Sequence, residues 1–337
     1  MKINYKKSLF VIILILNFTF YKVAIVISNN IIVFGSCSDQ KIKMNHWKEI
    51  VSFKPNHLFL LGDNVYGDFY GNNHNNLVRA YNLLDENKYF KYLKNNVPII
   101  SIWDDHDYGI NDGGKDWIYK DISKKLFLSF FNVSKDDIRY KRQGIYKSYK
   151  LNISNKLIKV IALDTRYFKD NFKLNKSNNR NKKYTEDYDA SKTILGSAQW
   201  KWFESQVKDN YDILIILSSY QVISKSHGWE KWNNFPHERK KFFDVISKLN
   251  KPTIILSGDR HVGGIYKHEN SDIYEFTASS FNKNTFYKSE QDPLRIGELI
   301  YENNYGVLEI NNSNIIGKIQ SGNKDKENLY NSLIINF

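Results

Sequence analysis

The residues in this chain best suited to chemistry follow short apolar runs. The densest group lies in residues 98–115, PIISIWDDHDYGINDGGK, where an apolar run leads directly into Asp104, Asp105, His106 and Asp107. Three carboxylates and an imidazole beside a buried strand are costly unless they are paired. In open α/β sheets, active sites form at the carboxyl ends of strands. We therefore interpret this segment as the centre of an active site.

Four further apolar runs end in groups of the same kind. These groups are Cys37, Asp63 with Tyr66, Asp164 with Arg166, and Asp259 with His261. So many carboxylates would repel one another unless cations lay between them. Carboxylates suit a hard ion such as calcium, whereas thiolate, phenolate and imidazole favour iron or zinc. The residues therefore predict a mixed metal site, with one softer ion and one or more hard ions.

Each of these signals, taken alone, also has a structural explanation. The alternatives are a small buried hydrophobe at the lone cysteine Cys37, a turn or helix cap at Asp63, a packed aromatic at Tyr66, an ion pair between Asp164 and Arg166, and a hydrogen-bonded pair of Asp259 and His261. The recurrence of such groups at successive strand ends is what favours a site.

The elements that would position these groups alternate between strands and helices. Strands are predicted over residues 31–34, 58–61, 99–103, 144–153, 157–163, 213–217 and 253–256, with short strands in the tail near 273–278, 306–310 and 315–319. Helical spacing covers residues 46–53, 77–93, 117–131, 197–207 and 236–249. This order predicts a layered α/β fold with the site along one rim. Without an internal repeat or a Pro/Gly linker, residues 31–337 are expected to form one catalytic domain.

Two segments stand apart from this alternation. Residues 168–195 are polar, rich in Lys and Asn and without period, which predicts an insertion that is either a lid over the site or disordered. Residues 1–30 combine a basic start with an apolar run too short for a spanning helix. We expect a secretory signal there, with an uncleaved membrane anchor as the alternative. The protein is thus expected in the secretory lumen, the periplasm or outside the cell.

Composition limits the class of protein. With 42% hydrophobic and 15% aromatic residues, the chain is folded and globular and not intrinsically disordered. The net charge of +13 would suit an anionic partner such as a phosphoester, a nucleic acid or a membrane. The lysines are spread over the whole chain, however, and no arginine cluster or stacking module stands out, so no dedicated nucleic-acid module is predicted. The sequence does not set the oligomeric state.

The order of the motifs resembles a known family. The segments GDNVYGD, WDDHDYGIND, LDTRYFKD, WNNFPHERKKF and SGDRHVGG are similar to those of the alkaline phosphatase D (PhoD-like) metallophosphatases, over residues 35–280. That family belongs to the calcineurin-like and purple-acid-phosphatase superfamily. The resemblance implies a four-layer α/β/β/α sandwich, two mixed sheets flanked by helices, with the metal centre where the strands of both sheets end.

The resemblance also implies roles for individual residues. It assigns the metal ligands as Cys37, Asp63 (bridging), Tyr66 (on ferric iron), Asp105, Asp259 and His261. It places His106 over the substrate and Arg166 on a phosphate oxygen. We further expect His106 to donate a proton and to be oriented by Asp107, and Asn64 and Asn111 to bind the substrate. Carboxylates replace neutral ligands of the usual pattern, which favours calcium beside iron, with zinc or manganese as alternatives. The segment SSYQVIS lacks the histidine ligand that the calcineurin pattern supplies there.

The expected function is metal-dependent hydrolysis of phosphate esters, as an alkaline phosphatase or phosphodiesterase with a multinuclear centre. The alternative is a phosphodiesterase that acts on phospholipid or nucleic acid. A third interpretation, a metal-stabilised binding protein without catalysis, is less favoured because the charged groups of the rim are all present.

Overall fold

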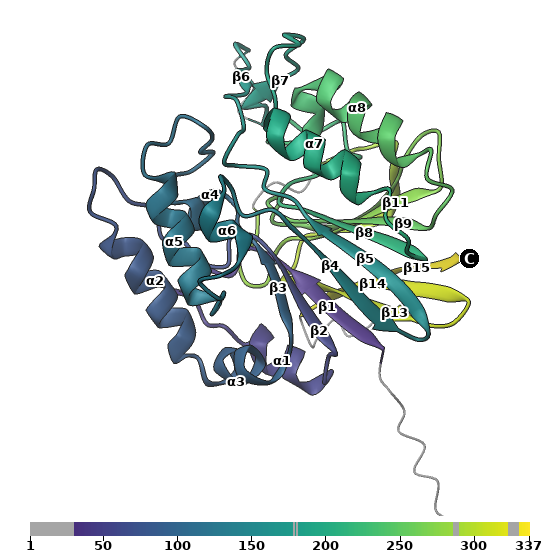
Figure 1. The fold of residues 1–337 in the computed structure, drawn as a ribbon, viewed down its shortest axis with the longest axis horizontal. Helices are drawn as coiled ribbons and strands as arrows, with labels where there is room; N and C mark the ends of the chain where they lie inside the picture. The colour runs from purple at the N-terminus through teal and green to yellow at the C-terminus, as the bar shows by residue number, and fades with distance from the viewer. Residues whose placement is uncertain (1–29, 178, 180, 286–289, 323–329) are drawn as a thin grey trace, which may run out of the picture.

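Two β-sheets packed face to face form the centre of the computed structural model, which describes residues 30–177, 179, 181–285, 290–322 and 330–337 (Figure 1). The predicted signal or anchor segment lies outside these residues, apart from Asn30. The first sheet has the order β15-β14-β13-β1-β2-β3 and the second β12-β10-β11-β9-β8-β5-β4. Helices cover the outer face of each sheet, so the four-layer α/β/β/α sandwich is confirmed.

The first sheet joins three parallel strands to three antiparallel ones. The parallel strands are β1 (Ile31–Gly35), β2 (His57–Leu61) and β3 (Ile99–Ile102). The antiparallel strands β13 (Asn304–Ile310), β14 (Asn314–Ser321) and β15 (Tyr330–Asn336) extend it from the β1 edge. The helices α1 (His46–Ser52), α2 (Asn75–Glu86), α3 (Lys88–Asn96) and α5 (Lys120–Phe130) belong to this half of the molecule (Figure 1).

The second sheet has a parallel centre with antiparallel edges. Its parallel strands are β5 (Lys156–Ala162), β8 (Ile213–Ser218), β9 (Thr253–Ser257) and β11 (Ile273–Ala278). The strands β4 (Lys147–Ile153), β10 (Gly263–Lys267) and β12 (Arg295–Ile300) pair antiparallel at its edges. The helices α7 (Gly196–Gln206) and α8 (Pro236–Ile246) cover its outer face (Figure 1).

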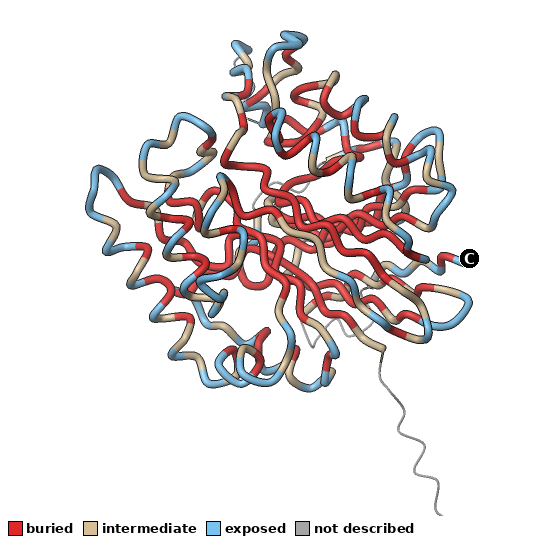
Figure 2. Tube along the Cα trace, in the orientation of Figure 1, coloured by how far each residue is buried: buried red, intermediate tan, exposed pale blue. Residues whose placement is uncertain are grey.

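Alternation along the strands divides the core between the layers. In β1, Phe34 packs between the sheets, whereas its neighbour Val33 packs with the helices of the first sheet. In β8, Ile215 faces the other sheet and Ile216 faces α7 and α8. Because successive strand side chains point to opposite faces, apolar residues at every position bury both faces of the sheet. Figure 2 shows the result as buried strands surrounded by helices with exposed outer surfaces.

Most predicted elements are present, with three differences. The expected helix over 77–93 is two helices, α2 and α3, because Asn87 is extended and its side chain caps α3 by accepting from the N–H groups of Tyr89 and Phe90. Strands β6 (Lys173–Leu174), β7 (Tyr184–Thr185), β10, β12 and β15 were not predicted, nor were the short helices α4 (Asp105–Tyr108), α6 (Ile138–Lys141) and η1 (Trp232–Asn234). Within the described part of the chain, no helix is long and apolar enough to cross a membrane.

Candidate metal centre and active site

The carboxyl ends of β1, β2, β3 and β9 meet at one rim of the sandwich, and residues that follow β2, β3 and β9 line a cavity of about 250 Å³. The cavity is lined by Asp63, Asp105, His106, Asn111, Asp112, Lys183, Tyr184, Trp229, Glu230, Asp259, Arg260, His261 and Thr285. Several lining residues belong to the set predicted from sequence, because parallel strands bring their ends to the same edge of each sheet. The turn after β2 fits closely: Gly62 has φ +101°, and a Cβ there would lie 2.5 Å from the Cβ of Asp104.

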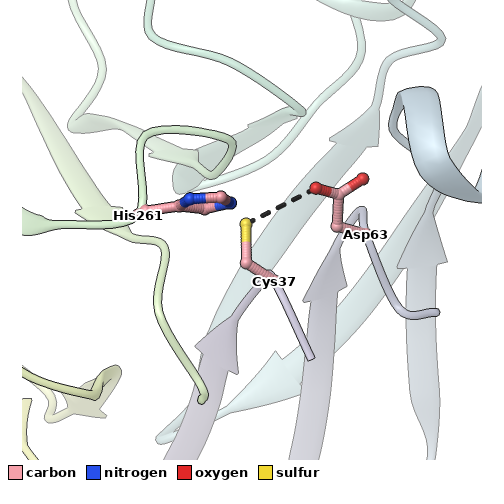
Figure 3. A group of neighbouring side chains, drawn as sticks. All are labelled: Cys37, Asp63 and His261. Atoms are coloured by element: carbon pink, nitrogen blue, oxygen red, sulfur yellow. Dashed lines mark hydrogen bonds between the residues drawn. The ribbon is translucent and has the colours of Figure 1, made fainter. Parts of the chain in front are cut away.

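One compact group of donors combines sulfur, oxygen and nitrogen. Donor atoms of Cys37, Asp63 and His261 all lie within 4.8 Å of one another (Figure 3). The Cys37 thiol donates to Oδ2 of Asp63 over 3.7 Å, and the Tyr66 hydroxyl lies 3.1 Å from Nε2 of His261. Four of the side chains predicted as metal ligands, Cys37, Asp63, Tyr66 and His261, therefore come together. The small-hydrophobe alternative does not explain why the Cys37 sulfur faces a carboxylate.

The electrostatics of this group indicate a shortage of positive charge. Burial, together with the carboxylate of Asp63, raises the pKa of the Cys37 thiol well above its ordinary value. Burial also raises the pKa of Tyr66, and Cys37 and Asp63 raise it further. Burial and three nearby carboxylates raise the pKa of Asp63, whereas His106 opposes this shift. A metal cation would reverse these effects by stabilising thiolate, phenolate and carboxylate together. The donor set therefore fits a softer metal ion of the kind predicted.

A second compact group shares Asp63 with the first. Donor atoms of Asp63, Asp105 and His106 also lie within 4.8 Å of one another. Asp259 lines the same cavity, but it is not part of any such group among the described residues. Its assignment as a ligand, like the rest of the ligand set, stays a prediction.

The helical turn α4 directs two side chains of the DDHD run toward the cavity and the other two away from it. Asp104 precedes the turn, and its backbone N–H donates to Oδ2 of Asp107, while Gly109 ends the turn with φ +102°. Asp105 and His106 line the cavity, whereas Asp104 and Asp107 are fully buried behind it. A single turn thus places two of the four groups toward the cavity.

His106 is oriented by a residue that the sequence analysis did not single out. Its Nδ1 lies 2.6 Å from Oδ2 of Asp68. Asp107 instead accepts hydrogen bonds from the backbone N–H groups of Asn64 and Val65, so the expectation that Asp107 orients His106 is wrong. Burial lowers the pKa of His106, but the surrounding carboxylates outweigh burial and raise it to about 11. Asp68 closes the GDNVYGD motif, which was the available signal.

Two other predicted residues also have different surroundings from those expected. The side-chain amide of Asn64 donates to the carbonyl of Ile102 and to Asp107, so Asn64 connects β2 to the turn after β3 and does not line the cavity. Asn111 does line it. Asp164 is buried and accepts from the indole of Trp103 and from backbone N–H groups, which makes it part of the scaffold.

Arg166 is fully buried and is held by carboxylates. Its Nε donates to Asp104 over 2.5 Å, and Nη2 lies 2.7 Å from Glu230, which Lys169 also contacts at 3.2 Å. The predicted structural alternative for Arg166, an ion pair with Asp164, is wrong, because the guanidinium pairs with Asp104 instead. Contact with a phosphate oxygen, as the resemblance implies, would require the guanidinium to leave one of these partners.

Asp112 and Glu230 were missed by the sequence analysis. With Asp105 they form a third group of donors within 4.8 Å. Asp112 was accessible as the last acidic residue of the WDDHDYGIND motif. Glu230 follows no strand, and only the packing of its loop against Arg166 brings it to the rim.

Residues 168–195 cover part of the site. The short strands β6 (Lys173–Leu174) and β7 (Tyr184–Thr185) pair with each other, and Lys183 and Tyr184 line the cavity. The Tyr184 hydroxyl donates to Asp112 over 2.6 Å, and the Lys183 ammonium pairs with the same carboxylate. The described residues of the segment therefore make defined contacts with the site, and its action as a lid stays a prediction.

The backbone is unusual at the same residues. Five of the non-glycine residues with positive φ belong to the site, namely Cys37 (60°), Asp63 (48°), Asp112 (57°), Asp259 (68°) and His261 (55°). A left-handed conformation is unfavourable for residues that carry a Cβ, and such residues concentrate at functional sites. This strain independently marks the rim as a site.

Comparisons with known proteins show the family and the fold. The sequence profile described as "PhoD-like phosphatase" matches residues 32–325. A solved "Structure of PhoD" superposes with a TM-score of 0.60 at 15% identity, covering 91% of this chain and 68% of the other. A search of curated proteins finds no match.

Two further solved structures share the fold. A purple acid phosphatase, PPD1 of yellow lupin (Lupinus luteus), superposes with a TM-score of 0.61 at 12% identity, over 91% of this chain and 53% of that one. The structure described as "GAP50 the anchor in the inner membrane complex of Plasmodium" gives 0.60 at 13% identity, over 91% and 89%. At these identities the likeness extends to the fold alone.

Proposed function

The chain belongs to the PhoD-like phosphatase family, whose members are phosphoric ester hydrolases, and from this premise we propose that it hydrolyses phosphate esters at a centre of at least two metal ions. The observation that carries the proposal is the position of Asp63. This carboxylate belongs both to the donor group that contains Cys37 and to the donor group that contains Asp105. A carboxylate shared by two donor groups is the arrangement that a bridging ligand requires.

The donor types support an assignment for each ion. Cys37, Tyr66 and His261, with Asp63, would hold ferric iron, because this ion favours anionic thiolate and phenolate ligands. Asp63 and Asp105, joined by Asp259, would hold calcium, which prefers carboxylate oxygens, with zinc or manganese as alternatives. When bound, these ions supply positive charge to the phosphate and lower the pKa of a coordinated water toward neutrality.

The chain's own residues supply the proton for the leaving group. Asp68 accepts from Nδ1 of His106, which leaves Nε2 for the cavity that His106 lines. The surrounding carboxylates keep this imidazole protonated, and bound cations would weaken their effect because they neutralise the same groups. A protonated histidine so placed donates a proton to the oxygen that departs from phosphorus. Asn111 and Lys183, which line the same cavity, would contact the phosphate.

The test measures metal content, colour and hydrolysis together. Purified protein should contain iron and absorb visible light, because thiolate and phenolate transfer charge to Fe(III). Cys37→Ser and Tyr66→Phe should each shift or bleach this absorption and lower the iron content. The protein should hydrolyse p-nitrophenyl phosphate and lose that activity with chelator. A colourless, iron-free protein that remains active would overturn the iron assignment. A protein that has its full metal content but does not hydrolyse the ester would overturn the proposed hydrolase activity.

The bis-ester of p-nitrophenol separates the two reaction classes. Faster hydrolysis of bis(p-nitrophenyl) phosphate than of the monoester would favour the alternative, a phosphodiesterase acting on phospholipid or nucleic acid. The secretory location rests on the basic and apolar sequence of residues 1–30. Comparison of the mature N-terminus with the printed sequence would test whether that segment is removed.

A further inference from the structure

A lysine outside the candidate metal groups lies against one of the expected ligands. The ammonium of Lys283 is 4.8 Å from the centroid of the Tyr66 ring. It also forms an ion pair with Asp39 over 2.8 Å, and the Asp39 side chain is only 7% exposed. A cation over an aromatic ring is attracted by the negative face of the ring. The contact therefore places a positive charge beside the phenol that is expected to bind iron.

The residues around this contact are fixed to one another by two side-chain amides. The amide of Asn282 donates to the carbonyl of Asp39 over 2.9 Å, and the N–H of Asp39 donates back to Oδ1 over 2.7 Å. The amide of Gln40 donates to the carbonyl of Tyr66 over 3.0 Å and accepts from its N–H over 2.8 Å. The backbones of the tyrosine and of the ion-pair partner are thus held in place. The fold therefore restricts where the ammonium of Lys283 can lie.

The positive charge of Lys283 extends to a second expected ligand. Nε2 of His261 lies 3.1 Å from the Tyr66 hydroxyl. Burial lowers the pKa of this imidazole to about 4, and the positive charges of His106, Arg260 and Lys283 contribute in the same direction. The carboxylates near Tyr66 act in the opposite sense, because they disfavour its phenolate form. Lys283 is therefore a counter-charge to the phenolate, whereas these carboxylates oppose the phenolate.

We propose that Lys283 is a positioning residue that acts through Tyr66 and adjusts the charge on the expected ferric ion. A positive charge beside the ring stabilises the electrons of the phenolate, so the ligand donates less charge to a bound metal. The ion then keeps more positive charge for the phosphate, and it is also more easily reduced. This inference rests on the proposed function, because it requires iron on Tyr66.

The test compares the absorption spectrum and the reduction potential of protein loaded with Fe(III). In Lys283→Met the phenolate-to-iron absorption should move to longer wavelength and the reduction potential should fall, because the phenolate donates more charge. Lys283→Arg keeps the positive charge and should restore most of both values. Lys43→Met, which changes an exposed lysine of the loop after Asp39, is the matched control and should alter neither value.

A double variant distinguishes this role from a structural one. Lys283→Met alone leaves the buried carboxylate of Asp39 without its partner, so Asp39→Asn with Lys283→Met is measured beside it. The double variant should keep the direction of both shifts and regain any stability that the single variant loses. In both variants the kcat for p-nitrophenyl phosphate should fall about 10-fold at an unchanged KM, as is typical for outer partners of metal ligands.

The outcomes separate the role of Lys283 from the hydrolase. If Fe(III)-loaded wild type absorbs visible light but Lys283→Met changes neither the absorption nor the potential, the role of Lys283 is overturned while the iron site stands. Shifts that the double variant abolishes would also overturn it, because they would arise from the unpaired carboxylate. A protein that takes up no Fe(III) would overturn the iron assignment and this inference together. Iron-loaded protein that shows the shifts but hydrolyses no ester would support the role of Lys283 and overturn the hydrolase.

Discussion

Two clusters of carboxylates, which we define by their counter-charges, lie at the cavity or directly behind it and are neutralised in different ways. Asp104, Asp112 and Glu230 pair with cations of the chain, namely Arg166, Lys183 and Lys169. Asp63, Asp105 and Asp259 form no ion pair with any lysine or arginine among the described residues. The first cluster brings its own counter-charges, whereas the second requires metal ions. The difference identifies which carboxylates should respond to metal and which should respond to changes in the chain.

The largest effect is expected from Asp63→Asn. The substitution keeps the size of the side chain but removes the negative charge shared by both donor groups, so both ions should be lost. We expect turnover to fall on the order of 10⁴-fold or more, measured with p-nitrophenyl phosphate alongside the metal content. Asp244→Asn, which changes an exposed partner of Lys240 on α8, is the matched control. Full metal content in the Asp63 variant would contradict the bridging role.

The next effect is expected from His106→Ala. Loss of the proton donor should reduce turnover by about 10² to 10⁴-fold while metal content is retained. Because Asp68 raises the pKa of His106, Asp68→Asn should lower that pKa and move the alkaline limb of the pH–rate profile to lower pH. Loss of metal in the His106 variant would make this residue a ligand, as its place in the second donor group allows.

Arg166→Met should act on stability. It leaves Asp104 and Glu230 buried without their main partner, at a cost of about 3 to 5 kcal/mol in the free energy of unfolding. Addition of Glu230→Gln should recover part of this loss, because one uncompensated charge is then removed. Urea denaturation with and without chelator should give the same difference. A higher KM with unchanged stability would instead place Arg166 on the substrate.

The smallest effect is expected from Lys183→Met. The Lys183 side chain is 39% exposed, and water screens its ion pair with Asp112. The loss in stability should be no more than about 1 kcal/mol by the same urea measurement. A loss as large as that of Arg166→Met would mean that Lys183 acts as a buried counter-charge and would remove the contrast within this cluster.

The sequence predicts the metal-dependent cluster better than the self-neutralised one. Asp63, Asp105 and Asp259 each follow an apolar strand, and strand ends in parallel sheets converge, so local pattern was enough to group them. Glu230 lies in a loop that tertiary packing alone brings to Arg166. Asn64 and Asp107 have site-like positions in their motifs, but their side chains satisfy backbone groups around the turns. Whether such a side chain contacts the substrate or hydrogen-bonds the backbone depends on the geometry of the turn, which the residue type alone does not reveal.

The left-handed backbone of the donors has a consequence for selection. At Cys37, Asp63 and His261 the chain adopts the region that glycine occupies most readily, at a cost of about 1 kcal/mol for each residue with a Cβ. In a library selected for folding in the presence of chelator, glycine should therefore be enriched at these positions. The same library selected for hydrolysis should retain the donors. The difference between the two enrichments would measure, at each position, the conformational free energy that the protein loses by keeping a metal donor there.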